Sequence, residues 1–190
     1  MIRLTIFFLI LFSLNKSVMA EEKKAYFAGG CFWCVEEAYE KTAGVKEVIS
    51  GYTGGHIKNP TYEQVSHEET GHYEAVEVIY DPAKISYDQL LDVFWKNIDP
   101  YDAKGQFCDK GSSYLSAVFY QNEEEKKAFE ESKKRLNKKD IESFATHIKK
   151  LDIFYPAEDY HQDFYKRNPI RYKYYKTSCG RVQRLKKIWN

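Results

Sequence analysis

The chain passes from a predicted strand to a predicted helix through the sequence Gly29-Gly30-Cys31-Phe32-Trp33-Cys34. The strand is the apolar run at residues 25–28, and the helix covers residues 35–41. The two glycines allow a tight turn and the close approach of another molecule. Because the first N–H groups and the dipole of a helix stabilise an anion, we expect a lowered pKa for the Cys31 thiol, which makes this residue a candidate nucleophile.

The second cysteine of this stretch, Cys34, lies on the same helical face as Cys31 and within its reach. A bond between two residues this close removes little chain entropy, so the pair is a poor structural staple. Its spacing is typical of redox or metal sites. Zinc is disfavoured because Cys108 and Cys179 do not form a second close pair. Two large aromatic residues separate Cys31 from Cys34, and we expect them to line a pocket.

The N-terminal residues 1–20 have the pattern of a secretory signal peptide. Arg3 precedes an apolar run at residues 4–14, and small residues lead up to Ala20. The run is shorter than the roughly 20 residues that span a bilayer. We therefore expect cleavage and a single domain at residues 21–190. The expected protein is exported and periplasmic, without stable membrane association. An uncleaved anchor remains an alternative.

Basic and acidic residues are nearly balanced along the chain. The 29 Lys and Arg residues face 28 Asp and Glu residues, for a net charge of +1. Loss of Arg3 and Lys16 with the signal peptide changes this to −1. This balance argues against a nucleic acid partner. One compact domain of this length is expected to be a monomer.

The remaining pattern predicts an α+β fold, a two-layer sandwich with a mixed or antiparallel sheet and helices. Strands are expected at residues 45–50, 74–80 and 114–120, a strand or turn region at 146–154, and helices at 86–98, 122–136 and 156–164. The segment from Ile170 is expected to be a mobile tail.

Two long polar loops interrupt these elements. Over 20 residues, 51–73, separate two strands with only a short helical turn at 61–66, and a loop of that length is usually functional. The second loop, residues 101–113, holds Cys108 and Asp109.

A thiolate with a neighbouring thiol is compatible with three chemistries. The first is thiol–disulfide exchange, and the second is cysteine hydrolysis, which needs a positioned histidine. The third is a reduction that passes through a sulfenic acid and needs a proton donor. A secreted binding module with two disulfides is a non-enzymatic alternative. The candidate bases of a hydrolase have no distinguishing neighbourhood; they are His56, His67, His72, His147 and His161.

Glu74 is the candidate proton donor for the third chemistry. It opens a predicted strand on an apolar face, directly after the long loop. Burial there would raise its pKa and keep the carboxyl protonated at neutral pH.

Six motifs in register extend these observations to nearly the whole chain. They are Gly30-Cys31-Phe32-Trp33-Cys34, Gly51-Tyr52-Thr53-Gly54-Gly55, Asn59-Pro60-Thr61-Tyr62, Gly71-His72-Tyr73-Glu74-Ala75, Phe94-Trp95-x-x-Ile98-Asp99-Pro100 and Phe154-Tyr155-Pro156-Ala157-Glu158-Asp159-Tyr160-His161-Gln162. Together they resemble peptide-methionine sulfoxide reductase A, a family specific for the S epimer of methionine sulfoxide. The resemblance implies an α+β sandwich with a ferredoxin-like core.

The resemblance also implies a role for each site residue. Cys31 corresponds to the nucleophile that attacks the sulfoxide sulfur, and Glu74 to the acid that protonates the oxygen. Tyr62 and Tyr114 correspond to the tyrosines that bind this oxygen. The reaction leaves methionine and a sulfenic acid on Cys31.

Substrate binding and recycling follow in the same way from the resemblance. Phe32 and Trp33 correspond to the pocket for the substrate methyl group, and Asp109 to an acidic residue of a nearby loop. No cofactor is implied. The substrates are oxidised proteins or peptides, and free methionine sulfoxide. For an exported enzyme we expect an exported thioredoxin-like dithiol as the reductant.

The resolving cysteine stays open between Cys179 and Cys34. We slightly favour Cys179, because a mobile tail can reach Cys31 without unwinding a helical turn, and a relay through both is an alternative. Cys108 is treated mostly as a bystander, with a resolving role as an alternative.

Two stretches depart from the family pattern. Gln106-Phe107-Cys108-Asp109 stands where Gln-Gly-Asn-Asp is common, and Ser113-Tyr114-Leu115-Ser116 where Gln-Tyr-Arg-Ser is common. The part of the site around Asp109 and Tyr114 is therefore expected to differ from the family pattern.

Overall fold

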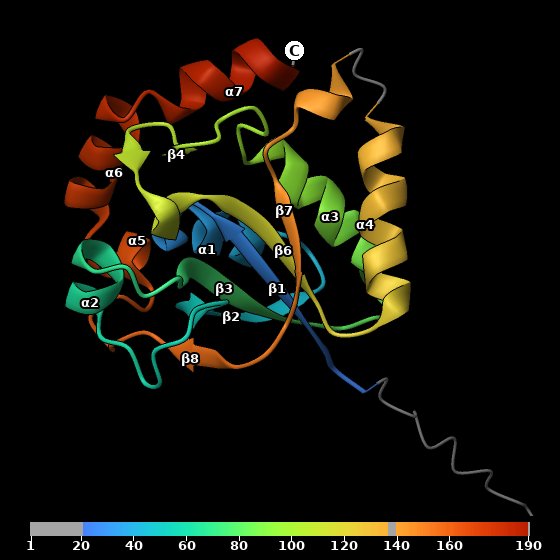
Figure 1. Ribbon diagram of the computed structural model, residues 1–190, viewed down its shortest axis with the longest axis horizontal. Helices are drawn as coiled ribbons and strands as arrows, with labels where there is room; N and C mark the ends of the chain where they lie inside the picture. The colour runs from blue at the N-terminus through green and yellow to red at the C-terminus, as the bar shows by residue number, and fades with distance from the viewer. Residues whose placement is uncertain (1–20, 137–139, 190) are drawn as a thin grey trace, which may run out of the picture.

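The computed structural model describes residues 21–136 and 140–189, and Figure 1 shows their arrangement. The expected signal peptide, residues 1–20, lies outside this range. The strands are β1 Lys23–Gly29, β2 Val45–Thr53, β3 Tyr73–Tyr80, β4 Gly105–Gln106, β5 Asp109–Lys110, β6 Ser116–Tyr120, β7 His147–Lys150 and β8 Phe154–Pro156. The helices are α1 Phe32–Glu40, α2 Tyr62–His67, α3 Tyr87–Lys96, α4 Glu123–Arg135, α5 Phe164–Arg167, α6 Pro169–Ser178 and α7 Arg181–Trp189, with short 3₁₀ turns η1 Ser112–Tyr114 and η2 Ile141–Ser143.

The main sheet has six strands in the order β7-β6-β1-β3-β2-β8. All neighbours are antiparallel except β6 and β7, which are parallel. Its central part is built by the succession β1-α1-β2-β3-α3-β6, with the strand order β6-β1-β3-β2. This is the ferredoxin-like arrangement, so the predicted α+β class with a mixed sheet is confirmed.

Helices α1 and α3 lie on one face of the sheet and bury the larger core against it (Figure 1). Helix α3 shows why the sequence pattern predicts this. Ser86 and Gln89 form a reciprocal capping box at its start. The apolar stripe at helical spacing is fully buried; its members are Leu90, Leu91, Phe94, Trp95 and Ile98. The opposite face carries a smaller cluster, crossed by the β7–β8 connection.

Three segments differ from the sequence-based expectation. The helix expected at residues 156–164 is wrong: this stretch forms turns, and α5 begins only at Phe164. Two causes are visible. Gln162 uses its side chain to bond both the N–H and the carbonyl of Ser50, at 2.9 Å each, and Asp163 has a left-handed φ of 54°.

The C-terminal segment forms α6 and α7 and is packed, so the expected mobile tail is wrong for residues 170–189. Trp189 donates its indole N–H to the Ile98 carbonyl at 3.1 Å, and Arg184 bonds Asp99 at 2.6 Å. The predicted loop at 101–113 contains the small hairpin β4–β5. Within residues 21–136 and 140–189 no helix is both long and apolar enough to cross a bilayer.

Candidate active site

A small cavity of about 70 Å³ lies at the start of α1. Its volume suits a small group such as a methyl sulfoxide. Its lining contains the seven residues proposed from the sequence as nucleophile, acid or substrate contacts, together with one further tyrosine: Cys31, Phe32, Trp33, Tyr62, Glu74, Asp109, Tyr114 and Tyr175. The structure therefore brings together, from five segments of the chain, the residues that the sequence analysis selected.

Cys31 stands at the N-cap of α1, directly after β1. The turn depends on Gly30, whose φ of +77° favours glycine. A Cβ on Gly30 would also lie 2.5 Å from the Gln106 Cβ, so only glycine lets the β4–β5 hairpin approach this turn. This explains the glycine before the nucleophile.

Cys31 and Cys34 are both buried, with 5% and 3% of their surface exposed, and they share a hydrogen bond. Burial raises the pKa of the Cys31 thiol well above its ordinary value, and Cys34 and Glu74 add to this. The same hydrogen bond lowers the pKa of Cys34 to about 6. The expected low pKa of Cys31 is therefore wrong, because burial outweighs the helix terminus.

Glu74 lies on β3 and is only 3% exposed. Burial raises the pKa of its carboxyl to about 8, although a hydrogen bond from the backbone N–H of Phe32, 3.0 Å from Oε2, acts in the opposite direction. The nearby Asp109 charge raises this pKa further. Glu74 is therefore protonated at neutral pH, as the sequence analysis expected.

Tyr62 and Tyr114 reach the cavity from α2 and η1, and their hydroxyls are hydrogen-bonded to each other. Burial raises the pKa of both groups, so both stay protonated. Tyr62 begins α2, and its backbone N–H donates to Glu158 at 2.8 Å. The other oxygen of Glu158 accepts from Tyr52 on β2 at 2.8 Å, which attaches α2 to the sheet.

Phe32 and Trp33 form the aromatic part of the lining. The Trp33 ring stacks on Phe164 with a centroid distance of 3.7 Å, and its indole N–H donates to Nδ1 of His161 at 3.2 Å. The Phe32 ring lies 6.4 Å from that of Tyr62. These contacts hold the indole in one orientation beside the nucleophile.

Tyr175 is the lining residue that the sequence analysis missed. It lies on α6, donates a hydrogen bond to Oδ2 of Asp109, and is hydrogen-bonded to Cys31. Burial raises the pKa of Asp109, and the Tyr175 hydrogen bond opposes this. The only sequence signal was its place four residues before Cys179, on the same helical face.

The two remaining cysteines, Cys108 and Cys179, form a disulfide with a Cα–Cα distance of 5.0 Å. Our treatment of Cys108 as a bystander is therefore wrong, and Cys179 is not a free thiol beside Cys31. These two sulfurs and Asp109 are grouped closely enough to hold a metal, but a disulfide offers no thiolate ligands.

None of the five histidines lines the cavity, so the hydrolase alternative finds no base there. His161 packs behind the aromatic rings.

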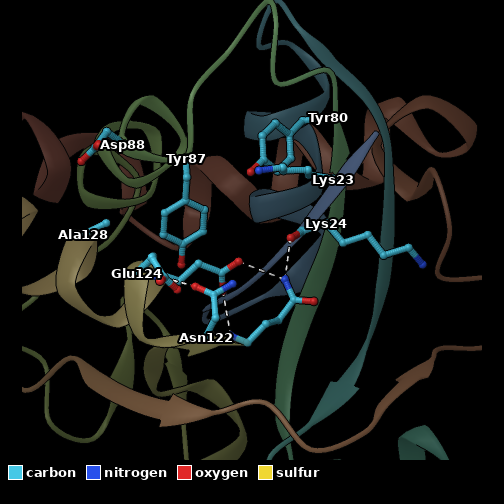
Figure 2. A pocket seen from close by; sticks show the side chains of 10 residues that line it. Lys23, Lys24, Tyr80, Tyr87, Asp88, Asn122, Glu124 and Ala128 are labelled. Carbon is cyan, nitrogen blue, oxygen red and sulfur yellow. Dashed lines mark hydrogen bonds between the residues drawn. The ribbon is translucent and has the colours of Figure 1, made fainter. Parts of the chain in front are cut away.

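A larger cavity, of about 650 Å³, lies elsewhere. Figure 2 shows Lys24 from β1, Tyr87 and Asp88 from α3, and Asn122 and Glu124 from the start of α4 around it. It contains lysines and carboxylates but no nucleophile, so its size does not mark the site of chemistry.

Comparison with known proteins agrees with this geometry. The family model described as peptide methionine sulfoxide reductase matches residues 23–190. The chain belongs to the peptide methionine sulfoxide reductase family. MsrA of Bacillus subtilis is 49% identical over 174 residues, which cover 90% of this chain and 98% of that protein. MsrA 2 of Staphylococcus aureus is 47% identical over 167 residues, covering 87% and 94%.

Solved structures give the same result. The reduced form of Mxr1 from Saccharomyces cerevisiae superposes with a TM-score of 0.74 at 29% identity, covering 82% of this chain and 92% of that one. Methionine sulfoxide reductase A of Corynebacterium diphtheriae gives 0.71 at 29% identity, covering 78% and 76%. The protein is thus a peptide methionine sulfoxide reductase of the MsrA type. The thiol–disulfide oxidoreductase and binding-module alternatives are not supported.

Proposed function

We propose that this reductase acts on the S epimer of methionine sulfoxide, in proteins and as the free amino acid, and that Cys31 attacks the sulfoxide sulfur. The observation that carries the proposal is the convergence of a buried thiol, a protonated carboxyl and paired tyrosine hydroxyls on one small cavity. Cys34 accepts the Cys31 proton through their hydrogen bond, so the negative charge of the pair passes to the attacking sulfur.

Oxygen removal needs a proton, and Glu74 supplies it. Tyr62 and Tyr114 donate hydrogen bonds to the oxygen without ionising themselves. The methyl group contacts Phe32 and Trp33. Because oxygen donors and aromatic rings are different groups of the lining, a single epimer satisfies both at once. Collapse of the intermediate releases methionine and leaves a sulfenic acid on Cys31.

Cys34 resolves this sulfenic acid. Its sulfur is hydrogen-bonded to Cys31 within the first turn of α1, whereas Cys179 is bonded to Cys108. Attack of the Cys34 sulfur on Cys31 forms an intramolecular disulfide and releases the hydroxyl as water. The sequence analysis slightly favoured Cys179; the pairing of Cys179 is the reason for preferring Cys34 here.

A thioredoxin-like dithiol then reduces the Cys31–Cys34 disulfide. A yeast relative, Mxr1, has been solved in complex with Trx2.

The pattern of residues 1–20 supports export, so the reductant is also exported and the substrates are oxidised envelope proteins. Intact-mass analysis of the secreted fraction tests this: a chain that begins at Glu21 supports export, and a full-length cytoplasmic chain contradicts it.

Single-turnover assays test the reaction. The protein with Cys31 and Cys34 reduced and the Cys108–Cys179 disulfide intact is mixed with a peptide carrying either epimer of methionine sulfoxide, without external reductant, and methionine and cysteine linkages are followed by mass spectrometry. One methionine per enzyme from the S epimer, with a Cys31–Cys34 bond, is expected. A Cys31→Ser variant serves as the unreactive control. Reaction of the R epimer alone, or no methionine, contradicts the proposal.

A further inference from the structure

The cavity wall formed by Asp109 and Tyr175 comes from two segments that are distant in sequence. Asp109 lies on the β4–β5 hairpin, and Tyr175 lies on α6. Each strand of the hairpin has two residues, and a two-stranded hairpin is marginally stable alone. The position of this wall therefore depends on what attaches the hairpin to the C-terminal helices.

Two links join the same two segments side by side. One is the hydrogen bond from the Tyr175 hydroxyl to Asp109, and the other is the disulfide between Cys108 and Cys179. Cys108 precedes Asp109 directly. The backbone N–H of Cys179 donates to the Tyr175 carbonyl at 2.9 Å, so Cys179 lies one helical turn after Tyr175. The disulfide thus holds the hairpin and α6 at the separation at which Tyr175 can reach Asp109.

The tip of the hairpin supports this interpretation. Phe107 has a left-handed φ of 56°, which is strained for a non-glycine residue and persists only where neighbours hold it. The guanidinium of Arg181 lies 4.5 Å from the centre of its ring. Phe107 and Cys108 occupy the positions where the sequence departs from the Gly-Asn pattern. Both departures therefore provide contacts to the C-terminal helices.

Tyr175 also touches the reacting group, since its hydroxyl is hydrogen-bonded to Cys31. We propose that the Cys108–Cys179 disulfide is a positioning device for the sulfoxide cavity, which holds Tyr175 and Asp109 against Cys31 and is opened by dithiols. This rests on the proposed function, because it concerns the same reaction. It assigns to this pair a role outside the resolving step.

The exposure of the pair makes it accessible to redox control. Cys108 is exposed, while Cys31 and Cys34 are buried. A dithiol reductant attacks one sulfur of the disulfide and then closes its own disulfide, transferring two electrons and two protons and leaving two thiols. An oxidised small-molecule disulfide reverses the exchange. Once the pair is opened, the wall keeps the Tyr175–Asp109 hydrogen bond and the Arg181–Phe107 contact but no covalent link.

Single-turnover kinetics without external reductant separates this role from resolution. In the double variant Cys108→Ser/Cys179→Ser we expect one methionine per enzyme, as in the wild type. The sulfoxide concentration for half-maximal burst rate should rise about tenfold, as expected for losing one well-placed hydrogen bond to a charged group. Tyr175→Phe should give a similar rise. It should also move the pH dependence of the burst upward, because Cys31 loses a hydrogen bond.

A double-mutant cycle completes the test. If the disulfide acts through Tyr175, adding Tyr175→Phe to the double variant produces little further change. Tyr165→Phe is the matched control. The Tyr165 hydroxyl donates a hydrogen bond to the Glu40 carboxylate at 2.6 Å, and Tyr165 does not line the cavity. An unchanged half-saturating concentration in the double variant overturns the proposal, and so do fully additive effects. If the double variant does not fold, Cys108→Ser alone is measured in the same way.

Failure of the two proposals is distinguishable. A wild-type enzyme that forms no methionine refutes the proposed reaction. A wild-type enzyme that reacts, with a folded double variant that binds sulfoxide equally well, refutes only the positioning role.

Discussion

The backbone N–H of Phe32 donates a hydrogen bond to Oε2 of Glu74 at 3.0 Å, next to the nucleophile Cys31. The first N–H of α1, which has no partner within the helix, therefore binds and orients the Glu74 carboxyl and does not bind an anion from solvent. This contact fixes the carboxyl within the cavity, while burial keeps the pKa of Glu74 at about 8.

Glu74→Gln should reduce the single-turnover rate by roughly 10²- to 10⁴-fold, the range expected for loss of a positioned general acid. In the wild type the rate should fall above about pH 8, as Glu74 loses its proton. The variant should lack this decline. Stopped-flow measurement between pH 6 and pH 9 provides the comparison. Glu36→Gln is the control, because Glu36 is also buried with a pKa raised to about 7 but does not line the cavity.

Stability should depend on the same carboxyl. The pKa of Glu74 is raised from 4.5 to about 8 in the folded state, so the unfolded state loses its proton first. The free energy of unfolding should therefore fall as the pH rises through this interval and level off above it. Urea denaturation of the wild type and of Glu74→Gln measures this. As the pH rises, the free energy of unfolding of the wild type should fall relative to that of the variant. A difference independent of pH contradicts the assignment.

Cys34→Ser should still form the first methionine but should not sustain turnover with a thioredoxin-like reductant. The sulfenic acid on Cys31 then persists, and a dimedone adduct on Cys31 should be detected by mass spectrometry. Normal turnover by this variant would show that another cysteine resolves the intermediate. Cys31→Ser should form no methionine at all.

Phe164→Leu should weaken substrate binding through Trp33. The ring of Phe164 stacks on Trp33 at an angle of 8°, and aromatic pairs contribute about 0.5–1.5 kcal/mol beyond burial. We expect the half-saturating sulfoxide concentration to rise about fivefold with little change in the maximal rate. Phe129→Leu is the control, because it removes a comparable stack on Trp95 in the core, with centroids 5.3 Å apart. That variant should lose stability, with no change in the half-saturating sulfoxide concentration.

The sequence predicted the elements whose signals are local. The capping box at Ser86, the apolar stripe of α3 and the alternating residues of β3 each specify their own structure within a few positions. The segment around Gln162 gave a wrong prediction because its side chain bonds β2, a contact between distant parts of the chain. Local propensity contains no signal for such a bond.

The site divides in the same way. Motifs along the chain selected Cys31, Glu74 and the aromatic residues by their chemical type and order. Tyr175 belonged to no motif and entered the site through the packing of α6 against the hairpin. The pKa values of the Cys31 and Cys34 thiols also depend on packing. Burial raises the pKa of Cys31, and its position at the start of a helix predicted the opposite direction.

By itself, then, the sequence determined which residue types are available and where the strands and helices begin, since backbone turns, caps and hydrophobic periodicity act over a few residues. Only the tertiary structure decided which side chains meet: the partner of Cys108, the Tyr175–Asp109 contact and the surroundings that raise the pKa of Cys31. These depend on contacts between segments far apart in the chain, and the energy of a buried charge or thiol depends on all the atoms around it.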